Sequence, residues 1–126
     1  MVIDLKPKGY NIYTTPKKTT NIEQSAIITL RASIREKAQD TANIAFSDHA
    51  RERIIERGIS LAEVVRVLTN GQFSQPVTTV EKASEHRFQL SHILAGREIV
   101  VHAVCQIDLN GGLFVITVFE ITMEIE

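Results

Sequence analysis

Hydrophobic residues recur every three or four positions in the first half of the chain, and this spacing predicts helices. The first helix is predicted over residues 21–39, because Thr20 and Glu23 have the spacing of a capping box just before an apolar stripe. The stripe consists of Ile27, Leu30, Ile34 and Ala38. Residues 43–46 are predicted to be a connector that leads to the next helix.

Residues that favour helix starts and stops predict two short helices within residues 46–71. These boundary residues are Ser47 or Asp48 as the first cap, Gly58 as the first stop, Ser60 with Glu63 as a second capping box, and Asn70–Gly71 as the second stop. The apolar stripe of the second of these helices is formed by Leu61, Val64, Val65 and Leu68. The segment is therefore predicted to be a helix, a tight glycine turn and another helix.

The last third of the chain has the pattern of β-strands. Strands are predicted at residues 77–81, 87–94, 98–107 and 113–121. Turns are predicted at Ala95–Gly96 and at residues 110–112, where glycine tolerates positive φ. The strand at 98–107 is apolar on both faces, which is typical of a central strand. Helices followed by antiparallel strands predict an α+β fold, with N-terminal helices packed on one face of a mostly antiparallel sheet of about four strands.

Length and composition are those of a one-domain globular protein, with 126 residues, a hydrophobic fraction of 44% and a charged fraction of 23%. Residues 1–20 are rich in Lys, Thr, Pro and Gly, and they are predicted to be a flexible basic arm or an edge strand. Residues 21–126 are predicted to be a single α+β domain.

Cysteine content and hydropathy indicate where the protein is found. The lone Cys105 cannot form an internal disulfide, which fits a reducing compartment. The sequence has no run of about 18 apolar residues and no apolar core of a secretory signal at its start. We therefore expect a cytoplasmic protein that does not enter a membrane.

The net charge of −1 argues against long-range attraction of an anionic polymer to the whole molecule. A local basic surface is still compatible with this balance. Lys17 and Lys18 belong to a basic arm that either touches phosphates or is a solvated linker.

One histidine and two arginines form a ridge on the helix that follows Phe46. His49, Arg53 and Arg57 are spaced by four residues, so they lie along one side of that helix. Ordinary ion pairs, Asp48 with Arg51 and Arg53 with Glu56, are the alternative explanation of these charges. Two like charges four residues apart weaken a helix slightly, which hints that an anion binds between Arg53 and Arg57.

A second polar set lies in the predicted strands. His86 and Arg87 open a strand in which alternation places Arg87 on the face opposite to Phe88. If Arg87, His102 and Thr117 share the open face of the sheet, they form a polar island that can bind a phosphate. The alternative is that each is an ordinary residue on a half-exposed face. The four histidines and Cys105 show no compact ligand spacing, so we expect no metal and no cofactor.

These residues carry a resemblance to a known family. The run SDHARERIIERGISLAEVVRVLTNG, a strand beginning HRF and a last strand containing VITVF resemble the small bacterial family called domain of unknown function 4258, over residues 46–119. That family is thought to share the fold of the RelE, ParE and BrnT toxins and of the barnase-like, metal-independent ribonucleases. The matching residues are His49, Arg53, Arg57, Gly58 and Ile59, with Arg87 and Thr117 in the strands.

The resemblance implies a toxin-type endoribonuclease that cleaves RNA by attack of the 2′-OH, without a metal. In that reaction His49 would be the base or acid, and Thr117 an orienting hydroxyl. The further roles it implies are Arg53 and Arg87 as phosphate ligands, His86 as a reserve acid and Arg57 as an RNA contact. Lys17 and Lys18 lie outside the resemblance, and they are expected RNA contacts because they belong to the basic arm. We expect His49 and Arg87 to converge on a common anion-sized pocket.

A non-catalytic interaction module is the alternative function. In that case the Arg ridge and an exposed sheet edge would bind an antitoxin, a phage protein or a host protein. Self-association to a homodimer stays open under either function.

Overall fold

The computed structural model describes residues 19–122, which form three α-helices and a seven-stranded sheet. The helices are α1 (Gln24–Ala38), α2 (Asp48–Arg57) and α3 (Leu61–Asn70), with 3-10 turns η2 (Thr41–Asn43) and η3 (Glu81–Ala83). The strands are β1 (Thr19–Asn21), β2 (Ile44–Phe46), β3 (Gln72–Phe73), β4 (Thr78–Val80), β5 (Glu85–Leu94), β6 (Arg97–Gln106) and β7 (Leu113–Thr122). None of these three helices is both long and apolar enough to cross a membrane.

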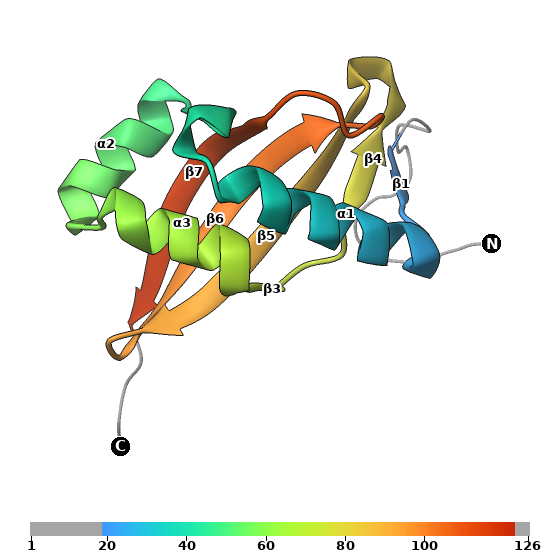
Figure 1. The fold of residues 1–126 in the computed structure, drawn as a ribbon. Coiled ribbons are helices and arrows are strands. Elements are labelled where there is room, and N and C mark those ends of the chain that lie inside the picture. The colour runs from blue at the N-terminus through green and yellow to red at the C-terminus, as the bar shows by residue number, and fades with distance from the viewer. Residues whose placement is uncertain (1–18, 123–126) are drawn as a thin grey trace, which may run out of the picture.

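The sheet is built around β5, β6 and β7, which have ten residues each. Its strand order is β1-β4-β5-β6-β7-β2, and β3 pairs with β5 beside this path. All pairs are antiparallel except β2 with β7. The three helices lie on one side of the sheet (Figure 1). The predicted α+β class is confirmed, but the sheet has more strands than the four expected.

The start of α1 corrects one prediction. Its N-cap is Glu23, whose side chain makes no capping hydrogen bond, so the capping box with Thr20 is wrong. Thr20 instead pairs with Thr79 between β1 and β4. The predicted apolar stripe is confirmed for three of its four positions, since only Ile27 stays partly exposed. The buried positions are Leu30, Ile34 and Ala38.

The predicted connector at 43–46 is also wrong, because Ile44–Phe46 forms β2. This strand pairs in parallel with Leu113–Val115 at the start of β7. The two chains approach so closely that a Cβ on Gly112 would lie 2.1 Å from the carbonyl oxygen of Asn43. Only glycine fits there. The pairing matters for the site because it fixes where the next helix begins.

The boundaries of α2 and α3 follow the predicted start and stop residues. Ser47 Oγ accepts a hydrogen bond from the Ala50 backbone N–H at 2.9 Å, and Gly58 ends α2 with φ of 63°. Both halves of the Ser60–Glu63 capping box are present at the start of α3. The apolar stripe of α3 differs from the prediction, because Leu61 is exposed and its buried residues are Val64, Val67 and Leu68.

The core lies between the helices and one face of the central strands. Alternate residues of β5, β6 and β7 are almost completely buried on that face. They are Phe88, Leu90, Ile99, Val101, Ala103, Val115 and Val118. Full burial of a large apolar side chain contributes about 1.5–3 kcal/mol relative to leaving it exposed. As predicted, β6 is a central strand.

Arg97 fastens the turn between α2 and α3 to the sheet. Its guanidinium donates to the carbonyl oxygens of Arg57 and Gly58, each at 3.2 Å. It also bonds to Glu120 at 2.6 Å and to Glu63 at 3.2 Å. These bonds satisfy carbonyls at the end of α2, which otherwise lack helical partners. They hold α2 in a fixed place beside β7.

Candidate functional site

The sheet face turned away from the helices carries a row of polar residues. Because the strand register places Gln89 beside His102 and His102 beside Thr117, these three side chains cross β5, β6 and β7 in one line. We call this line the polar row, and the face that carries it the open face. Arg87 lies two residues along β5 on the same face, opposite Val104.

Arg87 is the cation of the open face. Its side chain is 47% exposed, and its Nε donates to Glu85 Oε2 at 2.6 Å. A guanidinium bound through Nε still has two terminal amino groups that can hold a phosphate. Arg87, Gln89 and His102 line a hollow of about 270 Å³, together with Thr78. We call it the Arg87 hollow.

His102 is suited to accept a proton. The side chain is half-buried, and burial, followed by the nearby charge of Arg87, holds the pKa of this imidazole below its usual value. The ring is therefore mainly neutral at pH 7, with one nitrogen free to act as an acceptor. On the neighbouring strand Thr117 brings a hydroxyl to its side.

The N-terminus of α2 lies next to the far end of the polar row. Ser47 donates from its backbone N–H to the Val115 carbonyl at 2.9 Å and from Oγ to the Ile116 carbonyl at 2.6 Å. The helix therefore begins beside Thr117. His49, in its first turn, is exposed.

His49 and Arg87 do not form the expected common pocket. Strands β6 and β7 lie between α2 and the strand that carries Arg87. At roughly 4.8 Å per strand spacing, β5 and β7 are about 10 Å apart. The residues that line the Arg87 hollow include none from α2. The structure joins Arg87 with His102 instead.

Exposed ion pairs occupy part of the α2 ridge, as the alternative explanation predicted. Arg51 lies 3.8 Å from Asp48, and Arg53 lies 2.9 Å from Glu56. Such pairs contribute less than about 1 kcal/mol each. Arg57 is exposed at the end of the helix.

His86 lies on the other side of the sheet from Arg87. It is buried, and its Nδ1 lies 2.9 Å from Thr79 Oγ1. Burial lowers the pKa of this imidazole as well. The predicted role of His86 as a reserve acid is therefore not supported, because the sheet separates its imidazole from a phosphate bound by Arg87. Lys17 and Lys18 lie outside the described residues.

The described residues contain no group of three His, Cys, Asp or Glu placed to hold a metal ion, so no metal ligands are assigned within 19–122. Cys105 is buried, and burial raises the pKa of its thiol to about 11. The thiol is therefore protonated at neutral pH and is a poor nucleophile.

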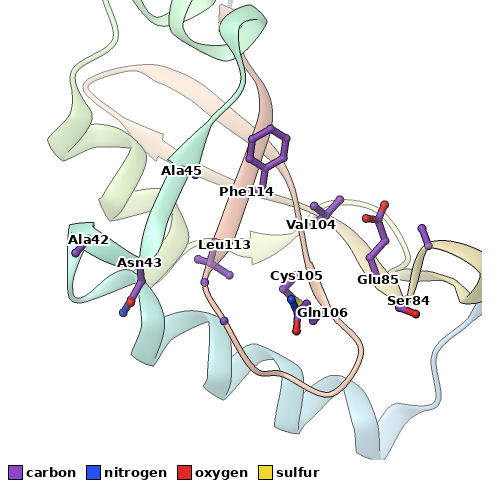
Figure 2. Close-up of a pocket in the computed structure, with 13 residues that line it drawn as sticks. Ala42, Asn43, Ala45, Ser84, Glu85, Val104, Cys105, Gln106, Leu113 and Phe114 are labelled. Carbon is purple, nitrogen blue, oxygen red and sulfur yellow. The ribbon is translucent and has the colours of Figure 1, made fainter.

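A second and larger hollow, of about 720 Å³, lies at the end of the sheet beside the β6–β7 loop. Figure 2 shows Ala45 and Phe114 on one side of it and Ser84 and Glu85 on the other. We call it the end hollow. Glu85 lines the end hollow and Arg87 lines the Arg87 hollow, so their ion pair joins one residue of each hollow. The predicted site residues did not include this region.

The family model of a domain of unknown function (DUF4258) matches residues 46–120. The chain belongs to this family. The matched DUF4258 segment runs from β2 to β7, so it contains the whole polar row and Arg87 but not α1. No match was found among curated proteins or among solved structures. The relation to RelE, ParE and BrnT toxins stays a prediction.

Proposed function

We propose that this DUF4258 domain is a metal-independent endoribonuclease that holds RNA across the open face of its sheet. The observation that supports this function is the Arg87 hollow, in which a cation and a neutral imidazole line one phosphate-sized space. Cleavage of RNA through its own 2′-OH needs a base, an acid and a cation for the phosphorane charge, and it needs no metal.

His102 is the proposed base. It takes the proton of the 2′-OH as the 2′-oxygen forms a bond to the adjacent phosphorus. Arg87 and the Gln89 amide bind the non-bridging oxygens, whose charge grows in the transition state. Thr117 orients the ribose through its hydroxyl, because it lies beside His102 in the polar row. The bond from phosphorus to the 5′-oxygen then breaks, which leaves a 2′,3′-cyclic phosphate.

The leaving 5′-oxygen requires a proton, and solvent is the proposed donor, because α2 with His49 lies on the helix side of the sheet (Figure 1) whereas the Arg87 hollow lies on the open face. Arg53 and Arg57 lie on the same helix, so they are not proposed as RNA contacts of the open face. Lys17 and Lys18 stay proposed RNA contacts.

A protein with this activity would act on cellular RNA in the cytoplasm as a toxin. An antitoxin could block it by covering the open face. This regulation is proposed from the resemblance to RelE and BrnT toxins, and the assay below tests the enzyme independently of it.

The test is cleavage of total RNA by the purified protein in EDTA. Wild type should release fragments with 2′,3′-cyclic phosphate ends. His102→Gln should lower the rate by about 10²–10⁴-fold, the usual contribution of a general base. Thr117→Val keeps the volume but removes the hydroxyl, and it should lower the rate less.

The matched control is Arg66→Ala, because Arg66 is exposed on α3 in the helix layer. Its rate should equal that of wild type, and circular dichroism should show that all variants are folded. Absence of cleavage by wild type would contradict the proposal, and so would an active His102→Gln variant.

Exposed apolar residues favour the second candidate, a non-catalytic module that binds a protein. Ile93 and Ile121 are exposed and flank Glu98 on the open face. Apolar residues grouped on one face are typical of a partner site. A co-purifying protein that Ile93→Asp and Ile121→Asp release, while Arg87→Ala does not, would favour this module over the nuclease.

A further inference from the structure

We propose that the end hollow binds an unpaired nucleobase of the same RNA strand, stacked on Phe114. This inference rests on the proposed function, because it takes the phosphate site at Arg87 as the neighbouring position. It adds a substrate class: single-stranded RNA with a base preference next to the cleavage site.

The position of the end hollow fits a nucleotide adjacent to the phosphate. Arg87, Val104 and Phe114 are register partners across β5, β6 and β7, so one line on the open face joins the two hollows. Phe114 lies two strand spacings from Arg87, about 10 Å. The ion pair between Glu85 and Arg87 joins one residue that lines each hollow.

The walls of the end hollow suit a flat, polar-edged ring. Phe114 is 42% exposed, and Val104, its register partner, adds apolar surface. Exposed aromatic side chains stack nucleobases, because each base has a flat π-face. Glu85 and Gln106 line the same hollow and can bond to the edge of a base (Figure 2). A base can reach such a hollow only when it is unpaired.

Glu85 predicts which bases are preferred. Its Oε2 accepts from Arg87, and its other carboxylate oxygen can accept a further hydrogen bond. Adenine, cytosine and guanine offer an exocyclic amino group as donor, whereas the one edge donor of uracil, N3–H, lies between two carbonyl oxygens that repel a carboxylate. The preference should therefore run against uracil.

The experiment uses the absence of Trp from this chain. Phe114→Trp places a unique fluorophore in the end hollow, and Ile55→Trp places one on α2, where Ile55 is 80% exposed. Both variants are titrated with short 2′-O-methyl RNA, which cannot be cleaved because it lacks the attacking hydroxyl. Binding of the same labelled oligonucleotides is followed in parallel by fluorescence anisotropy, for wild type, Phe114→Leu and Arg87→Ala.

The expected result is that oligo-A quenches the tryptophan emission of the Phe114→Trp variant and leaves that of the Ile55→Trp variant unchanged. Phe114→Leu should weaken oligo-A binding about tenfold, within the range of one base stack. Oligo-U should bind wild type about tenfold more weakly than oligo-A, because a hydrogen bond to a carboxylate is lost.

Two other outcomes would overturn the inference and are distinguishable. In the first, Arg87-dependent binding persists while the emission of the Phe114→Trp variant does not change, or changes no more than that of the Ile55→Trp variant. The base site is then wrong and the phosphate site stands. In the second, wild type binds no oligonucleotide, and the base site and the proposed function both fail.

Discussion

Phe88 and Gln89 are neighbours in β5, yet they lie on opposite faces of the sheet. Phe88 is 2% exposed beneath the helices, whereas Gln89 lines a hollow on the open face. The same division runs through β6, where Val101 packs in the core and His102 faces the other way. In these three strands one set of alternate residues forms the core and the other set forms the candidate site. Substitutions can therefore be made on one face without changing the other.

The largest expected effect comes from the covered face. Phe88→Ala should lower the free energy of unfolding by about 3–5 kcal/mol, because it leaves a cavity in the core. Gln89→Ala, one residue away, should change it by less than about 0.5 kcal/mol while weakening RNA binding. Urea unfolding measures the stability of the two variants, and titration with labelled RNA measures their binding. Similar losses of stability would show that the open face also supports the fold.

A glycine at the edge of the sheet gives the next effect. Gly112→Ala should lower the free energy of unfolding by about 1–3 kcal/mol. The reason is that the added Cβ would meet the Asn43 carbonyl at 2.1 Å. The loss should loosen β2 from β7 and thereby the start of α2. Hydrogen exchange should show weaker protection of the β2 amides in this variant than in wild type. Equal protection in the two proteins would contradict the close pairing.

Ser47→Ala tests how α2 is joined to the polar row. The variant removes the cap to Ala50 and the bond to the Ile116 carbonyl, and it should lower the free energy of unfolding by about 0.5–2 kcal/mol. Cleavage should fall with it, because the lost bond to the Ile116 carbonyl loosens β7 next to Thr117. Ser47→Thr should retain most of both properties. Full cleavage by Ser47→Ala would show that the bond to Ile116 does not position Thr117.

The smallest effect is a pH dependence that separates His86 from His102. Burial lowers the pKa of both imidazoles in the folded protein. Below the ordinary value of 6.5 the unfolded chain gains protons first, so stability falls as pH decreases from there toward the folded pKa values. In His102→Gln the free energy of unfolding should fall less on acidification than in wild type. In wild type the cleavage rate should start to fall only below pH 6.5, where His102 becomes protonated. Urea unfolding between about pH 5 and 8 measures the stability, and cleavage assays over the same range measure the rate. A stability that rises on acidification would contradict the assigned burial.

Local signals made α2 and α3 predictable. Ser47, Gly58 and the Ser60–Glu63 box act within a few residues of themselves, so the sequence alone determines where these helices start and stop. Strands β1 and β2 have only three residues each, and their partners lie far away in the chain. Three residues are too few to show an alternating pattern, which is why both strands were missed.

The site was predictable only in part. Alternation in β5 placed Arg87 opposite to Phe88 correctly, because that strand pairs without interruption. In β7 an irregularity opposite His102–Ala103 shifts the register, so Val115 faces the core and Thr117 faces the open side. Strict alternation would have put these two residues on one face. The place of His49 relative to Arg87 depended on the pairing of β2, which no local pattern encodes.

The most direct test of the central claim is to compare RNA binding by Arg87→Ala and Arg66→Ala. Labelled, uncleavable 2′-O-methyl RNA is titrated at several salt concentrations. The open-face account predicts that Arg87→Ala weakens binding by about tenfold or more and lowers the salt dependence by roughly one phosphate contact, while Arg66→Ala equals wild type. Equal affinities for the two variants, or a loss confined to Arg66→Ala, would contradict a phosphate site on the open face.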